Sequence, residues 1–223
     1  MRPIIDIIIP AFNEEPSIGL VLKDIPGDQV REVIVANNNS TDQTARVAED
    51  AGATVVLETR KGYGSACLKA MEHIAQKETP PDIVVFLDGD YSDHPEQLPE
   101  VVGPILTDGY DLVIGSRALG ELEPGAMQPQ QRFGNWLATR LIRWFYGYHF
   151  TDLGPFRAIR YPRLLDLQMR DPDFGWTVEM QVKAARMGLK CTEVPVRYRR
   201  RVGVSKVSGT VKGSILAGQK ILW

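Results

Sequence analysis

Short runs of apolar, mostly β-branched residues alternate with helix-like stretches through the first hundred residues, and this alternation constrains the fold more than any other feature. Alternating strands and helices favour a parallel sheet with helices on both faces, so we expect an α/β protein. Ligands of such sheets bind beyond the carboxyl ends of the strands. The runs predicted as strands are residues 4–9, 32–36, 54–57 and 82–87.

Helices are predicted between these strands, and the pattern becomes less regular beyond residue 110. Pro10 is expected to end the first strand, and Ser17 to cap the helix that follows. Residues 119–131 have no apolar period and contain Pro124, Gly125 and Pro129, which is typical of a mobile loop beside a site. Residues 111–114 and 191–198 are predicted as extended. The predicted helices are residues 17–24, 40–51, 64–76, 95–106, 132–148, 176–187 and 210–223.

Composition narrows the class of protein. The 223 residues are 43% hydrophobic and 24% charged with a net charge of −2, which is ordinary for a globular protein and gives no pull toward nucleic acid. Cys67 and Cys191 are too few for a disulfide framework and fit a reducing compartment. No run reaches the ~18 apolar residues of a transmembrane helix. We therefore expect a cytoplasmic protein, compatible with a peripheral position at the inner face of a membrane. The final Ile221-Leu222-Trp223 leaves open a membrane segment beyond residue 223.

The fourth strand ends in Asp88-Gly89-Asp90. Along an extended chain residues i and i+2 point the same way, so both carboxylates can converge on one point, and Gly89 leaves room for a ligand near the backbone. Two converging carboxylates are costly without a cation, and Mg²⁺ or Mn²⁺ shared with a diphosphate is the natural one. The alternative is a solvated acidic turn, because a lone Asp-x-Asp is common.

Two basic segments could meet phosphates. One is the glycine-rich Arg60-Lys61-Gly62-Tyr63-Gly64, which opens a helix at a strand end. The other spans residues 197–206 and is the most basic stretch of the chain. Arginine suits phosphate, so Arg157, Arg199 and Arg200 are also candidates on the acceptor side. The alternative for a charge run is a solvated face.

The predicted helix 132–148 mixes aromatic residues with Arg140 and Arg143. It is either a core helix whose arginines extend to water or a helix that touches lipid headgroups.

Several motifs occur in order on the predicted loops. They are Ile9-Pro10-Ala11-Phe12-Asn13-Glu14, Ser40-Thr41-Asp42, Asp88-Gly89-Asp90, Gly154-Pro155-Phe156-Arg157 and Arg201-Val202-Gly203-Val204-Ser205-Lys206. Together they resemble the family 2 glycosyltransferases of GT-A fold, and most closely the polyprenyl-phosphate hexose synthases, the dolichol-phosphate mannose synthase group. The chain departs from that pattern at Asn37, where the family usually has Asp, at the inserted Pro155, and in the spacing between Arg201 and Gly203.

The resemblance implies a GT-A-type, Rossmann-like αβα sandwich with a mostly parallel sheet. It implies one domain over residues 1–223, with a nucleotide-sugar half (1–116) and an acceptor-side half (117–223). The implied activity is metal-dependent, inverting transfer of a hexose from a GDP-mannose or UDP-glucose type donor, with a polyprenyl or dolichyl phosphate as acceptor. A soluble or glycan hydroxyl acceptor, or a non-catalytic nucleotide-sugar-binding relative, are the alternatives.

The resemblance also implies roles for individual residues. Asp88 and Asp90 would hold the metal, and Asp90 and Arg201 would act in catalysis. Asp152 would be the base for a hydroxyl acceptor, the alternative being a turn-forming aspartate. Arg201 and Lys206 would clamp the diphosphate. The other residues on the donor side are Pro10, Asn13, Glu14, Asn37, Asp42, Lys61, Gly62 and Gly89.

A nucleotidyl or phosphoryl transfer enzyme is the remaining rival class. It is disfavoured because the chain contains no Gly-x-x-x-x-Gly-Lys-Ser/Thr loop. The sequence predicts no oligomeric state.

Overall fold

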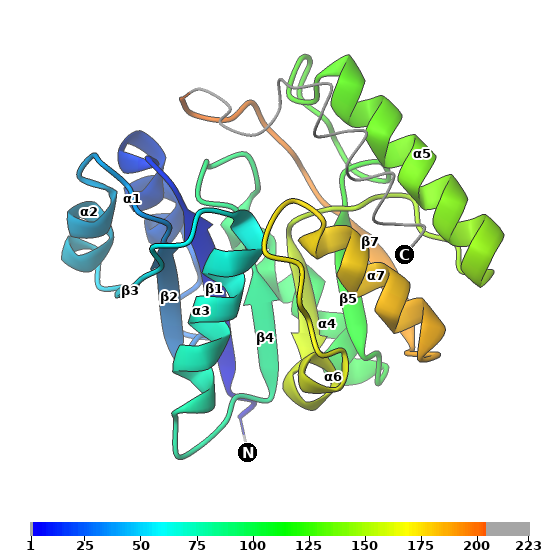
Figure 1. Cartoon of the computed structure of the whole chain (residues 1–223), viewed down its shortest axis with the longest axis horizontal. Helices are drawn as coiled ribbons and strands as arrows, with labels where there is room; N and C mark the ends of the chain where they lie inside the picture. The colour runs from blue at the N-terminus through cyan, green and yellow to red at the C-terminus, as the bar shows by residue number, and fades with distance from the viewer. Residues whose placement is uncertain (1, 204–223) are drawn as a thin grey trace.

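The structure, a computed structural model, describes residues 2–203. Lys206 and the predicted helix 210–223 lie outside the described residues. Figure 1 shows one sheet running through the molecule with helices packed on each side of it.

The sheet has seven strands in the order β3-β2-β1-β4-β6-β5-β7. Strands β1, β2, β3 and β4 are parallel, β7 is parallel to β5, and β6 lies antiparallel between β4 and β5. The predicted α/β class with a mostly parallel sheet is confirmed. The strands are β1 (Ile5–Ala11), β2 (Glu32–Asn37), β3 (Thr54–Leu57), β4 (Ile83–Phe86), β5 (Leu112–Ser116), β6 (Arg157–Arg160) and β7 (Cys191–Pro195).

Helices cover both faces of the sheet because each central strand is apolar on both sides. One core joins alternate strand residues such as Ile8 and Phe86 to α3, α6 and α7. The other joins Ile7 and Val85 to α1, α2 and α4. The helices are α1 (Glu15–Asp24), α2 (Thr44–Asp50), α3 (Tyr63–Ala75), α4 (Leu98–Thr107) after the 3₁₀ turn η1 (Pro95–Gln97), α5 (Pro129–Tyr146), α6 (Tyr161–Asp166) and α7 (Trp176–Arg186).

Two expectations about the first loop are wrong. Pro10 does not end β1, which continues to Ala11. The β1–β4 ladder ends at the Ile8–Phe86 pair, so Pro10 lies past it and its missing N–H costs no ladder bond. Ser17 is not the cap of α1, which begins at Glu15; the Ser17 hydroxyl instead donates to the carbonyl and the carboxylate of Glu14, both at 3.1 Å.

The segment before α5 is more anchored than the sequence predicts. Helix α5 begins at Pro129 with a capping box between Gln128 and Gln131, so the last residues of the expected loop are helical. Upstream, the Glu123 amide donates to the Tyr198 carbonyl at 2.9 Å, and the Arg200 amide donates to the Glu123 carboxylate at 2.7 Å. This segment is therefore tied to the chain that follows β7.

No helix within residues 2–203 combines the length and the apolar character needed to cross a bilayer. The division at residue 116 coincides with the end of β5, but the strands on either side share one sheet. The functional division into two halves stays a prediction.

Candidate active site

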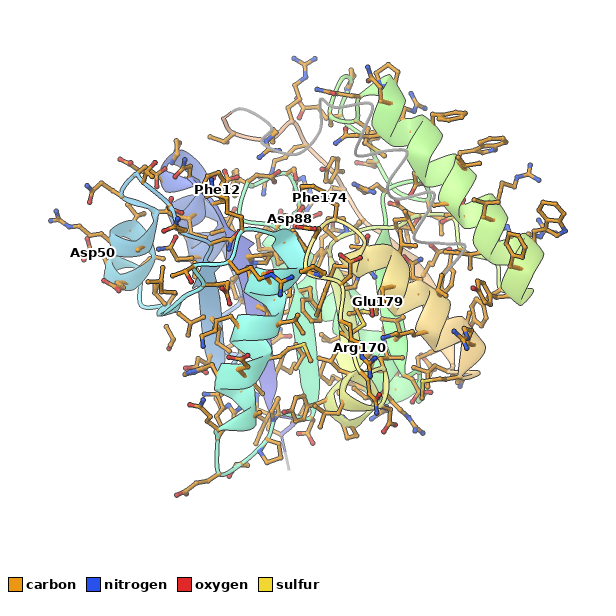
Figure 2. The ribbon with its side chains drawn as sticks, viewed as in Figure 1. Phe12, Asp50, Asp88, Arg170, Phe174 and Glu179 are labelled. Carbon is orange, nitrogen blue, oxygen red and sulfur yellow. The ribbon has the colours of Figure 1, made fainter. Side chains whose placement is uncertain are left out.

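Asp88 and Asp90 lie just past the end of β4, at the carboxyl edge of the parallel strands, and Figure 2 shows Asp88 there. The Tyr63 hydroxyl, from the first turn of α3, donates to Asp88 Oδ1 at 3.0 Å. Asp90 Oδ1 accepts from the amide and the hydroxyl of Ser92 at 2.9 and 2.5 Å. One oxygen of each carboxylate is thus oriented by a neighbour.

A third carboxylate, Asp93, belongs to this group and was not among the sequence candidates. Its side chain is buried, and within the described part of the chain its Oδ1 accepts no hydrogen bond. Burial and the charge of Asp90 raise the pKa of Asp88 to about 7. Burial and the charges of Asp88 and Asp90 raise the pKa of Asp93 well above its usual value. Three carboxylates, those of Asp88, Asp90 and Asp93, therefore lie close together at this edge. Their Asp-x-Asp-x-x-Asp spacing in the sequence could have indicated this.

Arg201 supplies positive charge to this edge. Its Nη1 lies 3.3 Å from Asp90 Oδ2, and its Nη2 lies 3.2 Å from Glu14 Oε1. The Val202 amide also donates to the Asp90 carbonyl at 2.9 Å. The fold therefore brings together Glu14, Asp90 and Arg201, three candidates that are far apart in the sequence.

The candidates at the ends of β1 and β2 reach the same edge, where one contact joins their two loops and others shape the second loop. The Thr41 amide donates to Asn13 Oδ1 at 2.8 Å, with Asn13 in the left-handed region (φ 54°). Asn37 Oδ1 accepts from the Ser40 amide at 3.0 Å, and Asp42 Oδ1 accepts from the Thr44 amide at 3.0 Å. These contacts shape the walls of the edge.

The loop holding Lys61 and Gly62 is fixed by Asn38, which the sequence analysis missed. The Asn38 amide group donates to the Arg60 carbonyl at 2.8 Å, and its Oδ1 accepts from the Gly62 amide at 2.9 Å. A Cβ on Gly62 would lie 2.1 Å from the Pro172 carbonyl oxygen, and one on Gly64 would lie 1.8 Å from that of Asp171. Close packing of another loop therefore explains both glycines. Lys61 is exposed beside them.

Gly89 also has a different setting from the expected one. A Cβ there would point at Ile9 and the Pro10 carbonyl, both 3.5 Å away, which is ordinary contact. The position that a Gly89 side chain would occupy thus faces β1. The absence of that side chain does not open space for a ligand, contrary to the sequence expectation.

Asp152 is held in an ion pair with Arg117, and its role as a base stays a prediction. Its side chain is buried, and Oδ2 accepts from the Arg117 amide at 2.7 Å and from Arg117 Nε at 2.8 Å. Its Oδ1 accepts from Arg117 Nη2 at 2.7 Å. Both oxygens take part in a bidentate ion pair, which fixes the orientation of the carboxylate.

The three arginines expected on the acceptor side are also engaged elsewhere. Arg157 is buried and donates to the carbonyls of Leu153 at 2.9 Å and Thr177 at 3.1 Å, and burial lowers its pKa to about 10. Arg199 lies 3.5 Å above the Tyr91 ring and donates to two backbone carbonyls. Arg200 Nε donates to a loop carbonyl at 2.7 Å. The structure does not support a role for these arginines in binding phosphate, because their guanidinium groups donate hydrogen bonds to backbone carbonyls.

Residues 6–164, which include this carboxylate edge, match the model of the glycosyl transferase family 2. The chain belongs to this family. It is therefore a glycosyltransferase, as the motifs predicted.

Relatives within the family differ in length. Glycosyltransferase AglJ of Haloferax volcanii is 36% identical over 196 residues, which cover 87% of this chain but 63% of AglJ, so the chain spans less than two thirds of that relative. A dolichyl-phosphate hexose transferase of the same organism is 32% identical, covering 94% of this chain and 89% of the relative. An undecaprenyl-phosphate mannosyltransferase of Micrococcus luteus is also 32% identical, covering 92% and 88%.

Solved structures of one enzyme in different complexes share the fold of this chain. Glucosyl-3-phosphoglycerate synthase of Mycobacterium tuberculosis in complex with UDP superposes with a TM-score of 0.77 at 26% identity, covering 99% of this chain and 79% of that chain. Its complex with Mn²⁺, UDP and glucosyl-3-phosphoglycerate gives a TM-score of 0.73 at 25% identity, covering 99% and 77%. The predicted GT-A-type fold is confirmed.

The carboxylates of this glycosyltransferase fit a divalent cation. No three His, Cys, Asp or Glu side chains among residues 2–203 already form a metal cage. Mg²⁺, however, is commonly held by one or two carboxylates together with substrate phosphates. Asp88 and Asp90 offer such a pair, and the unpartnered Asp93 Oδ1 is a further hard oxygen beside them. The donor set therefore suits Mg²⁺ or Mn²⁺ completed by a diphosphate.

Proposed function

We propose that this glycosyltransferase moves a hexose from a nucleoside diphosphate sugar to the phosphate of a polyprenyl or dolichyl lipid, with inversion at the anomeric carbon. The observation that carries the proposal is the contrast between the under-neutralised Asp88–Asp90 edge and the fully paired Asp152. The relatives named for dolichyl-phosphate hexose and undecaprenyl-phosphate mannose transfer support the acceptor class.

On the donor side, Asp88 and Asp90 would hold Mg²⁺ or Mn²⁺, which offsets the charge that develops on the leaving diphosphate. Tyr63 and Ser92 orient the two carboxylates, so little reorganisation is needed. The Mn²⁺ and UDP-glucose complex of the structural neighbour supports this donor chemistry.

Arg201 is suited to meet the diphosphate. It now lies against Asp90, and its Nε is buried with no acceptor among the described residues. When a diphosphate binds, the guanidinium would exchange its carboxylate contact for phosphate oxygens, which it can bind in a bidentate manner. Lys206, outside the described residues, is proposed as its partner.

The remaining donor-side candidates would surround the nucleoside. Pro10 lies near the end of β1 and is followed by Asn13 and Glu14, and Asn37 ends β2 and is followed by Asp42, so both groups lie at the carboxyl edge where such ligands bind. Lys61 stands exposed on the loop after β3.

On the acceptor side, a phosphate needs no base, because it is already anionic. A hydroxyl acceptor would need one, and the predicted base Asp152 has both oxygens bound to Arg117. The structure of the site thus favours a phosphate nucleophile. A polyprenyl phosphate resides in a bilayer, so we propose that the enzyme works at a membrane surface.

A soluble phosphorylated acceptor is the second candidate. It is favoured by the match to glucosyl-3-phosphoglycerate synthase solved with phosphoglyceric acid, with a TM-score of 0.75 at 26% identity.

The test offers radiolabelled GDP-mannose and UDP-glucose with polyprenyl phosphate in detergent, or with phosphoglyceric acid, in Mn²⁺ buffer. We expect label in a butanol-extractable product for wild type and for Asp152→Asn, and none for Asp90→Asn. Label that appears only in a water-soluble product would overturn the lipid acceptor. No transfer of either label to either acceptor would contradict the proposed reaction.

A further inference from the structure

Helix α5 and its flanks form a surface with cations and no acids. Residues 124–151 contain Arg132, Arg140, Arg143 and His149 but neither Asp nor Glu. The helix buries little of itself: its buried residues are Ala138, Thr139 and Ile142. Figure 1 shows α5 at the periphery of the molecule, far from β1 to β3. Its exposed large side chains are Phe133 (60%), Trp136 (52%), Trp144 (79%) and Phe145 (51%).

A pocket of about 190 Å³ opens at the C-terminal half of this helix. Because a water molecule takes about 30 Å³, the pocket has room for a phosphate group and some water. Two guanidinium groups and an imidazole lie in its walls, together with two hydroxyls that already bond to the Trp136 carbonyl and the Ser116 hydroxyl. The lining residues are Thr139, Arg140, Arg143, His149, Phe150 and Thr151.

The cations of the pocket are not neutralised by the protein. Within residues 2–203, neither Arg140 nor Arg143 pairs with a carboxylate; Arg140 contacts the Trp136 ring at 5.8 Å. Two carboxylates beside Thr151, those of Asp152 and Glu193, already accept hydrogen bonds within the protein. Asp152 binds Arg117, and Glu193 accepts from the Thr151 amide at 2.8 Å and the Asp152 amide at 3.1 Å. The pocket therefore presents positive charge to an external anion.

We propose that this pocket binds the phosphate of an anionic phospholipid headgroup, and that the exposed aromatic rings of α5 lie against the same bilayer. The guanidinium fork binds phosphate oxygens in pairs. Aromatic rings such as those of Trp144 and Phe145 favour the headgroup level. The bound lipid is a docking ligand, distinct from the acceptor, since the pocket residues belong to α5 and its C-terminal turn, not to the Asp88–Asp90 edge.

Two other occupants fit the observations less well. A free phosphate would satisfy the arginines but leave the exposed aromatic rings unexplained. A second copy of the chain in a two-fold contact would place this cationic face against itself, which is repulsive.

The test is co-sedimentation with vesicles of phosphatidylcholine, with and without phosphatidylglycerol, in the absence of any polyprenyl phosphate or donor. Arg140→Gln/Arg143→Gln is compared with Arg2→Gln/Arg46→Gln, which removes the same charge from two exposed arginines elsewhere. Each arginine near an anionic surface contributes about fivefold in binding, so the first variant should bind about 25-fold more weakly. The second should bind as wild type does, and added salt should weaken the binding of wild type.

The outcomes separate the alternatives. Equal binding of the two double variants, or no binding of wild type, overturns the proposal. Calorimetric binding of inorganic phosphate that Arg140→Gln/Arg143→Gln abolishes, without vesicle binding, would assign the pocket to free phosphate instead. Dimerisation in sedimentation that Trp144→Ala abolishes, again without vesicle binding, would assign the face to a second copy. None of these results depends on which acceptor the enzyme glycosylates.

Discussion

The edge beyond β4 and the turn before β6 each bury an aspartate beside an arginine, yet the two pairs differ in balance. Asp152 binds Arg117 through both oxygens, with contacts of 2.7 and 2.8 Å, although the charge of Arg117 also lowers the pKa values of Asp88 and Asp93. Asp90 shares Arg201 with Glu14, and Asp88 and Asp93 lie close by. The first pair is complete as folded. The Asp90–Arg201 pair leaves negative charge at the edge that a metal ion would neutralise. Both aspartates are buried, so the balance of charge, and not burial, distinguishes the carboxylate proposed to bind metal.

The largest expected effect is on the unbalanced edge. Asp90→Asn should lower the transfer rate about 10³-fold, the scale of losing one preorganised electrostatic contact. Its thermal midpoint should change little, because removal of one of three like charges offsets the lost ion pair with Arg201 and the amide oxygen can still accept from Ser92. Radiolabel transfer and thermal melts measure both quantities. Near-normal transfer by this variant would show that Asp90 is no more important for the reaction than Asp152.

The balanced pair should show the opposite behaviour. Asp152→Ala leaves Arg117 buried without its partner and should cost about 3–5 kcal/mol of unfolding free energy. The rate per folded molecule should change only a few-fold. Urea denaturation gives the first quantity, and transfer normalised to folded protein gives the second. A stable protein with a collapsed rate would restore Asp152 as a catalytic base.

Two helical glycines, Gly64 in α3 and Gly103 in α4, should respond differently to substitution by alanine. Gly64→Ala puts a Cβ 1.8 Å from the Asp171 carbonyl oxygen and should cost about 1–3 kcal/mol of stability. Gly103→Ala is the matched control, since nothing lies within 4 Å of its Cβ in α4. That change should stabilise the protein by about 0.5–1 kcal/mol. Equal denaturation midpoints for the two variants would contradict the close packing of the 171–173 loop.

The smallest expected effect concerns the orientation of Asp88. Tyr63→Phe removes a 3.0 Å hydrogen bond to Oδ1, worth about 1 kcal/mol. Binding of nucleoside diphosphate with Mn²⁺ should weaken about fivefold, whereas metal-free binding should not change. Tyr110→Phe, a tyrosine packed beside Lys190, is the control. Calorimetry that shows no difference between the two variants would remove Tyr63 from the site.

The sequence predicted the first half of the sheet well because its signals are local. The strand Thr54–Leu57 was predicted with its observed bounds, and the Asp88-Gly89-Asp90 turn falls directly after β4. The position of β6 could not be predicted, since the pairing of Phe86 with Arg157 joins residues distant in sequence. Asp152 was predicted as a site residue for the same reason, since its partner Arg117 is 35 residues away in the sequence.

The spacing of residues in the sequence also gives wrong predictions of site residues where a side chain contacts a partner that is distant in sequence. The Lys61–Gly62 loop has a composition typical of a phosphate loop, but its glycines meet the backbone of Pro172 and Asp171. Arg157 has the pattern of an acceptor ligand and instead holds buried carbonyls. Asp93 could have been found from its spacing to Asp88 and Asp90, but its lack of a hydrogen-bond partner is visible only in the fold.

We expect the Asp88–Asp90 edge to bind a metal–diphosphate unit and the Arg117–Asp152 pair not to bind one. Titration calorimetry of UDP and GDP, with and without Mn²⁺, tests it directly on wild type, Asp90→Asn and Asp152→Asn. Mn²⁺ should tighten the binding of one nucleotide about tenfold or more in wild type and in Asp152→Asn, and should have no effect in Asp90→Asn. Equal enhancement by Mn²⁺ in all three proteins, or in none of them, would contradict the account.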